Sequence, residues 1–168
     1  MVDQKQLLIE LQEYVEFHLH HDSIFAAQDI EAEEKIYSEA IVQHELEDFI
    51  KSNRQPTLNQ MLFSFIDQKG ISDVDIYKKA GIDRRHFSKI RSNENYRPGK
   101  NTIIALAFSL ELNEEDAERL LATAGYSLSD SDTQDLIIQF FLEKEIYDID
   151  LVNLALDNFN LKPLTGNR

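Results

Sequence analysis

The densest group of side chains capable of specific chemistry lies between residues 84 and 91. Arg84, Arg85 and Lys89 supply positive charge, and His86 and Ser88 between them supply hydrogen-bonding groups. A guanidinium can donate two hydrogen bonds to one planar acceptor, and all three cations attract phosphate oxygens. These residue types therefore favour an anionic partner that is rich in hydrogen-bond acceptors.

The same segment offers little for catalysis. Ser88 lies near a histidine, but His86 is two residues away and would project from another face of a helix. No acid is placed to orient that histidine, and the chain has neither a glycine-rich phosphate loop nor a His-x-x-x-His pair. We expect a protein that is not an enzyme and needs no cofactor.

A second cluster, His18, His20 and His21 followed by Asp22, invites comparison with a metal site. His18 and His21 are three residues apart and have no acidic partner at a set spacing, which a metal site would require. A solvated helix end explains the cluster better. The chain also has no Cys, which excludes thiolate metal sites and disulfide scaffolds, so no metal site is predicted.

Charge is distributed in three blocks around the 84–91 segment. Residues 1–56 contain 4 Lys/Arg and 13 Asp/Glu, residues 57–110 contain 9 and 5, and residues 111–168 contain 4 and 13. The blocks carry −9, +4 and −9, which gives the net charge of −14. This distribution favours binding of a polyanion by the basic middle block and contacts with other partners by the acidic ends.

The overall composition indicates a folded helical protein. With 168 residues, 42% of them hydrophobic, and only 5 Gly and 3 Pro, the chain can form long regular elements around a core. No apolar stretch approaches the roughly 20 residues that span a bilayer, and the acidic N-terminus lacks the order of a secretion signal. We expect a soluble cytoplasmic protein without a membrane segment.

Apolar residues recur three and four apart along the chain, and alternating strand patterns are absent, so the sequence predicts an all-α fold. Residues 1–56 are expected to form an acidic helical region, either a hairpin or a dimerisation element. Its second helix begins near Asp29, and the polar run Lys51–Pro56 marks a boundary. The apolar positions of this region are Leu7, Leu8, Leu11, Tyr14, Val15, Leu19, Ile36, Ile41, Leu46, Phe49 and Ile50.

Residues 57–125 are expected to form five helices, and residues 126–168 a helical extension. Polar residues suited to N-caps precede the predicted helices, and glycines follow three of them. We expect the apolar residues of the extension to pack on the first and fifth helices of the 57–125 domain. The predicted N-caps are Thr57, Ser72 or Asp73, Asp83, Asn113, Asp132 or Thr133, and Asp148, and the glycines are Gly70, Gly81 and Gly125.

One stretch resembles a known family. A tight turn precedes the basic segment, apolar positions follow at helical spacing, and a short loop leads into the last helix. In this order and spacing, residues about 57–124 resemble the lambda-repressor-like (XRE-type) helix-turn-helix domain of bacterial and phage regulators. The matching positions are Gly81-Ile82-Asp83, Phe87-Ser88, Ile90, Pro98, Ile103, Leu106, Ala107 and Leu110–Asn113.

The resemblance implies a five-helix lambda-repressor-like domain, with extra helices at both ends, that places residues 84–91 in the major groove of double-stranded DNA. It implies base contacts from Arg84, Arg85, His86, Ser88 and Lys89. It implies phosphate contacts from Arg91, Tyr96, Arg97 and Lys100. The expected function is a sequence-specific transcriptional regulator that binds DNA as a homodimer.

Two positions depart from the family pattern. Asp73 stands where the family commonly has a phosphate-binding Gln, and Tyr77 stands where it prefers Ala, so the second and third helices must repack or separate. An alternative hypothesis is a protein-interaction module, such as an antitoxin, inhibitor or assembly factor, that binds a partner through the acidic terminal helices. RNA binding has less support, because Tyr96 is the only evident stacking platform.

Overall fold

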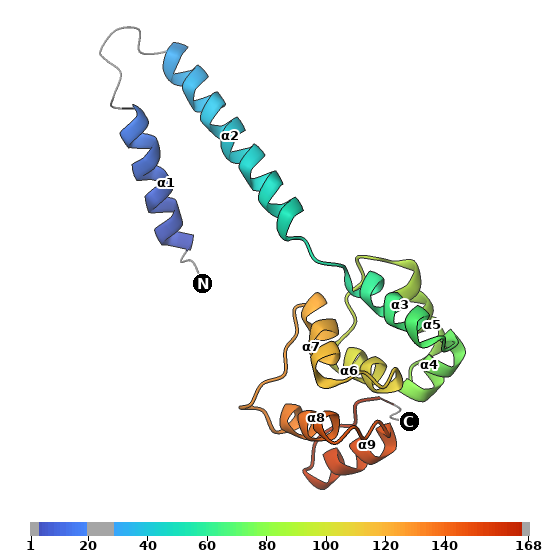
Figure 1. The fold of residues 1–168 in the computed structure, drawn as a ribbon. Helices are drawn as coiled ribbons and strands as arrows, with labels where there is room; N and C mark the ends of the chain where they lie inside the picture. The colour runs from blue at the N-terminus through green and yellow to red at the C-terminus, as the bar shows by residue number, and fades with distance from the viewer. Residues whose placement is uncertain (1–3, 20–28, 166–168) are drawn as a thin grey trace. The chain divides into compact units, whose positions relative to one another are not determined.

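The computed structural model describes residues 4–19 and 29–165, and within these ranges every regular element is a helix. The all-α prediction is confirmed for this part of the chain. The chain divides into two compact units, residues 1–54 and residues 55–168 (Figure 1). This division falls inside the polar Lys51–Pro56 run.

The first unit contains two helices, α1 (Gln4–Leu19) and α2 (Asp29–Asn53). The helix α2 ends where Asn53 Nδ2 donates a hydrogen bond of 2.8 Å to the Phe49 carbonyl. None of the side chains described in this unit, at residues 4–15 and 31–54, is buried. The predicted helices are therefore present, but the apolar faces described are not covered. His20, His21 and Asp22, and the side chain of His18, lie outside the described residues.

The second unit begins with five helices that follow the expected order. Four of the five are capped by a side-chain oxygen that accepts a backbone N–H, from Thr57, Ser72, Asp83 and Asn113, as the sequence predicts. Gly99 precedes the remaining helix without a side-chain cap. The five helices are α3 (Leu58–Lys69), α4 (Asp73–Ala80), α5 (Arg84–Ser92), α6 (Lys100–Ser109) and α7 (Glu114–Thr123).

The helix α6 forms the centre of the core. Its residues from Ile103 to Ser109 are all buried, so it is apolar on every side, as expected of an element surrounded by others. It contacts α4, α7 and α9, while α3 packs on α7 (Figure 1). This arrangement leaves α5 at the edge of the unit, where it contacts α4.

Two further helices complete the second unit, α8 (Thr133–Glu143) and α9 (Ile149–Asn158), capped by Asp132 and Asp148. The helix α8 packs on α7 and α9 packs on α6. The expected contact with the fifth helix of the domain is therefore present, but the principal second partner is α6 instead of the first helix, α3. Residues 55–168 form one compact unit, in which α9 contacts the central helix α6.

Several apolar residues of this extension do not pack as the sequence suggested. Leu136, Phe140, Ile146 and Leu151 are exposed by 37–53%. Other apolar residues of the two helices are buried, as expected: Ile138, Phe141, Leu142, Ile149, Val152 and Leu156. The periodicity identified helices correctly but could not select which of two apolar faces turns inward.

Six helices of this unit end at a residue in the left-handed conformation. Three of these residues are glycines, which adopt positive φ without steric cost, and the others are Glu111, Glu145 and Asn160, with φ of 53°, 53° and 57°. The backbone N–H of Ile146 closes the end of α8 by donating to the Phe141 carbonyl at 3.0 Å. The two glutamates hold a conformation that costs about 1 kcal/mol.

Candidate nucleic-acid interface

The helix α5 presents an exposed cationic edge, which we define as Arg84, Arg85 and Lys89. Its opposite side carries Phe87 and Ile90, which are buried to 3% and 1% exposure. All three cations of the edge are exposed, together with Ser88. Within the described part of the chain, the side chains of Arg84 and Arg85 enter no ion pair. Of the residues predicted to contact bases, His86 is half-buried and the other four are exposed to solvent.

The turn between α4 and α5 fixes the orientation of this edge. Gly81 has a φ of 69°, in the left-handed region, and the Ile82 N–H donates to the Tyr77 carbonyl at 2.9 Å. These two features cap the C-terminal end of α4. Ile82 is then buried, and the Asp83 carboxylate accepts the Arg85 N–H at 2.6 Å to begin α5. Only three residues, Gly81 to Asp83, connect α4 to α5, and both helix ends at this turn are capped.

Tyr77 forms part of the packing between α4 and α5. Its ring centroid lies 5.7 Å from that of Phe87, and the Phe63 ring of α3 meets the same Phe87 edge-on at 6.1 Å. Aromatic pairs at these separations stabilise a fold beyond their burial alone. Tyr77, Phe63 and Phe87 thus form a three-ring cluster under α5.

The C-terminal end of α5 is capped by a residue that sequence reasoning missed. Asn59 Nδ2, from α3, donates to the carbonyls of Ile90 at 2.8 Å and Arg91 at 3.0 Å. The last carbonyls of a helix have no partner within the helix, so this amide satisfies two of them. No local pattern could have indicated Asn59, because its partners lie 31 and 32 residues away.

Arg91 binds within its own chain. Its Nε lies 2.7 Å from the Asp73 carboxylate, and its guanidinium lies 4.3 Å from the centre of the Phe63 ring. Asp73 is therefore the partner of Arg91 and links the start of α4 to the end of α5. Both side chains remain partly exposed, so the pair adds little net stability.

Tyr96 lies beside the cationic edge. Its hydroxyl oxygen is 3.0 Å from His86 Nε2, and the Lys89 ammonium lies 4.4 Å from the centre of its ring. The ring is half-buried, and its contacts tie the loop after α5 to the helix itself. These three residues, all predicted to contact DNA, are brought together by the structure.

Arg97 lies against the C-terminal extension. Its Nε donates to the Ala124 carbonyl at 2.6 Å, and its guanidinium stacks on the Tyr126 ring at 4.3 Å from the centre. The Tyr126 hydroxyl in turn donates to the Pro98 carbonyl at 3.1 Å. The loop before α6 is thus fastened to the segment that follows α7.

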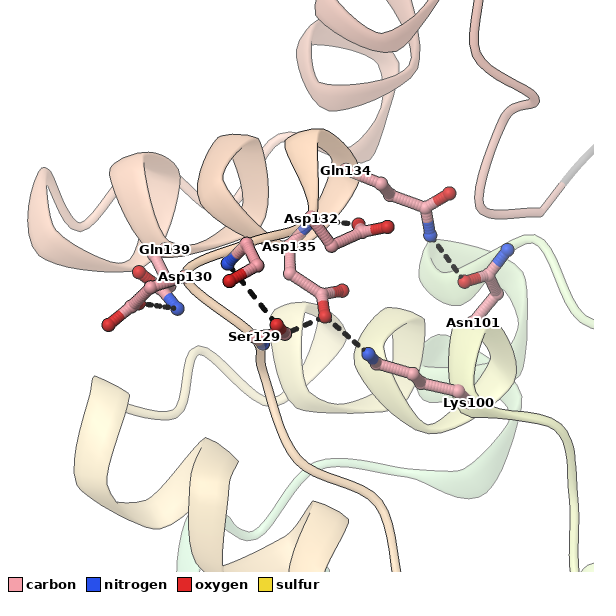
Figure 2. Close-up of polar contacts among 9 residues, drawn as sticks. Lys100, Asn101, Ser129, Asp130, Asp132, Gln134, Asp135 and Gln139 are labelled. Atoms are coloured by element: carbon pink, nitrogen blue, oxygen red, sulfur yellow. Dashed lines mark hydrogen bonds and ion pairs between the residues drawn. The ribbon is translucent and has the colours of Figure 1, made fainter.

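Lys100 forms an ion pair with Asp135 of α8, at 2.6 Å (Figure 2). Asp135 is 3% exposed, and the same carboxylate oxygen accepts the Ser129 N–H at 2.9 Å. A second bond runs beside the pair, from Gln134 Nε2 to the Asn101 side-chain oxygen at 2.7 Å. These polar contacts join the start of α6 to α8, a role that sequence reasoning did not assign to Lys100.

A separate surface cavity of about 640 Å³ lies between the end of α4 and the turn from α8 to α9. Its lining mixes charges of both signs, including Lys78, Glu111 and Glu145. Burial, with the neighbouring carboxylates of Glu145 and Glu111, raises the pKa of the Tyr147 phenol above its ordinary value of 10.0.

Among the side chains described, no group of three His, Asp or Glu residues is arranged to hold a metal ion.

None of the described helices is both long and apolar enough to cross a membrane. Comparisons with protein-family models, with curated proteins and with solved structures found no match for this chain.

Proposed function

We propose that α3–α7 form a lambda-repressor-like helix-turn-helix domain that binds double-stranded DNA, with the cationic edge of α5 in the major groove. The observation that carries this proposal is the exposure of Arg84 and Arg85 in the first turn of a helix held rigidly by α3 and α4. In this docking geometry, the N-terminal residues of the second helix of the motif reach base edges. Each arginine can pair with a guanine through two hydrogen bonds.

The packing under α5 supports the same proposal. Direct readout requires side chains that are held in place, and α5 is fixed at both ends by Asp83 and Asn59 and underneath by Phe87. The DNA-binding residues that we propose are the predicted base-contacting set with Tyr96 added. Arg91, Arg97 and Lys100 have partners in their own chain, so we assign them to positioning the loop rather than to phosphate contact.

This assignment sets the expected salt dependence. The cations of the edge are assigned to base edges, and Arg91, Arg97 and Lys100 are paired within the chain, so one domain neutralises few phosphates. The logarithm of the affinity should therefore fall with a slope no steeper than about −1 against the logarithm of the salt concentration, and one domain alone binds weakly.

The experiment is a fluorescence-anisotropy titration of the full chain at 50 and 200 mM salt. The probes are a duplex selected by the protein from a random pool and the DNA upstream of its own gene. We expect Arg84→Ala/Arg85→Ala to weaken binding to the selected duplex at least 10-fold and to leave the salt slope nearly unchanged, because these side chains are assigned to base edges. Lys144→Ala, at the end of α8, is the matched control and should leave both values unchanged. Absence of binding at micromolar protein, or an unchanged affinity in the double variant, would refute the proposal.

A second candidate function is a protein-interaction module on the same scaffold. It is favoured by the pairing of Arg91, Arg97 and Lys100 within the chain, and by the −18 carried outside residues 57–110 (−9 and −9). A stoichiometric protein partner recovered from nuclease-treated lysate, with no shift of either DNA probe, would favour this function over DNA binding.

A further inference from the structure

Tyr96 is held beside α5 by the turn that follows this helix. Its backbone N–H donates to the Asn93 carbonyl at 3.1 Å, and the Asn95 N–H donates to the Asn93 side-chain oxygen at 3.0 Å. The Tyr96 hydroxyl oxygen lies 3.0 Å from His86 Nε2, and the two rings meet edge to face with their centroids 5.9 Å apart. The hydroxyl therefore meets one particular nitrogen of the histidine ring.

The other ring nitrogen of His86, Nδ1, is accessible to solvent. It has no hydrogen-bond partner among the described residues, in contrast to Nε2. In this same part of the chain, no half-buried side chain carries a nitrogen or oxygen that is both enclosed and without a partner. Since His86 is half-buried, its Nδ1 must lie in the accessible part of the ring. This nitrogen is thus the group that His86 can offer to a partner.

The bond at Nε2 decides what Nδ1 can do. A neutral imidazole has one N–H donor and one acceptor nitrogen, and the bond made by one nitrogen selects the role of the other. A phenol O–H is more acidic than the N–H of a neutral imidazole, so the Tyr96 hydroxyl donates and His86 Nε2 accepts. The ring proton then lies on Nδ1, which becomes a donor.

We propose that Tyr96 is a positioning residue that holds neutral His86 as the Nδ1–H tautomer, so that α5 presents a hydrogen-bond donor to a phosphate oxygen or a purine N7 of double-stranded DNA. This inference rests on the proposed function. Phosphate oxygens and purine N7 atoms accept hydrogen bonds and do not donate them. The Nδ1–H form can bind them, whereas the Nε2–H form would turn a lone pair toward them.

The first test needs no DNA. Long-range nitrogen–proton NMR spectra of the full chain at pH 8.5 report which ring nitrogen of each of its five histidines carries the proton. His86→Gln identifies the signals of His86. We expect Nδ1–H in the native chain and a shift toward Nε2–H, the form that a free neutral imidazole favours, in Tyr96→Phe. Phenylalanine keeps the ring that lies 4.4 Å from the Lys89 ammonium, so this substitution isolates the hydroxyl.

Tyr126→Phe is the matched control for the tautomer. It deletes a comparable hydroxyl bond, to the Pro98 carbonyl at 3.1 Å, which fastens the same loop. The hydroxyl of Tyr126 is not bonded to His86, so this variant should leave the tautomer of His86 unchanged. A change common to both variants would instead reflect a loosened loop.

The second test is a double-variant cycle, measured by anisotropy with the selected duplex. Tyr96→Phe should weaken binding by the native chain roughly 2- to 10-fold, the value of one hydrogen bond. It should change binding by His86→Ala less than about 2-fold, because Tyr96 acts through His86. Methylphosphonates at single phosphates and 7-deazapurines at single purines then locate the acceptor. One of these modifications should weaken binding by the native chain and not by His86→Ala.

The outcomes separate this role from the proposed function. An Nδ1–H tautomer that depends on the Tyr96 hydroxyl, with the expected coupling and one sensitive acceptor, supports the inference. It is overturned by an Nε2–H tautomer in the native chain, by an equal change in Tyr126→Phe, by equal effects of Tyr96→Phe with and without His86, or by the lack of a sensitive acceptor. In those cases DNA binding through Arg84 and Arg85 stands. Absence of binding by the native chain refutes the proposed function and the role of His86 with it.

Discussion

Replacing only Lys100 of the Lys100–Asp135 ion pair should destabilise the protein far more than replacing both residues by apolar ones. Lys100→Met leaves the Asp135 carboxylate 3% exposed with only the Ser129 N–H as a partner. Removing one member of a buried pair typically costs 3–5 kcal/mol. The Lys100 side chain is 27% exposed, so water screens the pair in part and the lower end applies, at about 3 kcal/mol.

The assay is scanning calorimetry of the full chain, with urea denaturation followed by circular dichroism. For a cooperative unit of this size, about 1 kcal/mol corresponds to roughly 4 °C, so Lys100→Met should lower the melting temperature by about 12 °C. The matched control is Lys79→Met, which breaks the Lys79–Glu111 pair at 3.0 Å, whose side chains are 46% and 56% exposed. That variant should lose less than about 1 kcal/mol.

A double variant completes the argument. Lys100→Met with Asp135→Leu replaces both charges by apolar groups and should recover most of the stability lost in Lys100→Met, because no uncompensated charge remains. The reasoning is wrong if Lys100→Met costs no more than Lys79→Met, or if the double variant is less stable than Lys100→Met.

Three further predictions concern the positioning of α5 and the ends of helices. Asn59→Ala should cost about 1–2 kcal/mol in urea denaturation by leaving the carbonyls at the end of α5 without their amide partner, whereas Asn95→Ala, at an exposed loop position, should cost less than half of that. Tyr77→Ala should destabilise by about 2–3 kcal/mol through loss of the ring contact with Phe87, and an unchanged midpoint would contradict the packing described. Glu145→Gly should stabilise by about 0.5–1 kcal/mol by relieving a φ of 53°, and should lower the pKa of Tyr147 toward 10.0 in an ultraviolet pH titration. Because the pKa of Tyr147 is raised in the folded state, the stability that this phenol contributes is complete below pH 10 and is lost as the pH rises above it. Glu145→Gly should therefore make the fall in stability over this pH range smaller.

The sequence by itself determined where most helices begin and end. Thr57, Asp83 and Asn113 were predicted as caps from their residue type and from the apolar spacing that follows, and each accepts a backbone N–H as expected. Caps and periodicity act within four residues, so the information is local. The left-handed positions at Glu111 and Glu145 escaped this reasoning, because glutamate has no intrinsic preference for them.

Only the tertiary structure decided which cations of residues 57–110 are bound within the chain and which remain exposed to a partner. Arg91, Arg97 and Lys100 look equivalent to Arg84 and Arg85 in the sequence, but they meet partners 18, 27 and 35 residues away. Such pairings depend on how α4 and α7 pack on α6 and how α8 packs on α7. Helix packing is set by the fit of many side chains at once rather than by any local pattern. The cationic edge of α5 therefore consists of the basic side chains of this helix that form no ion pair with the described residues.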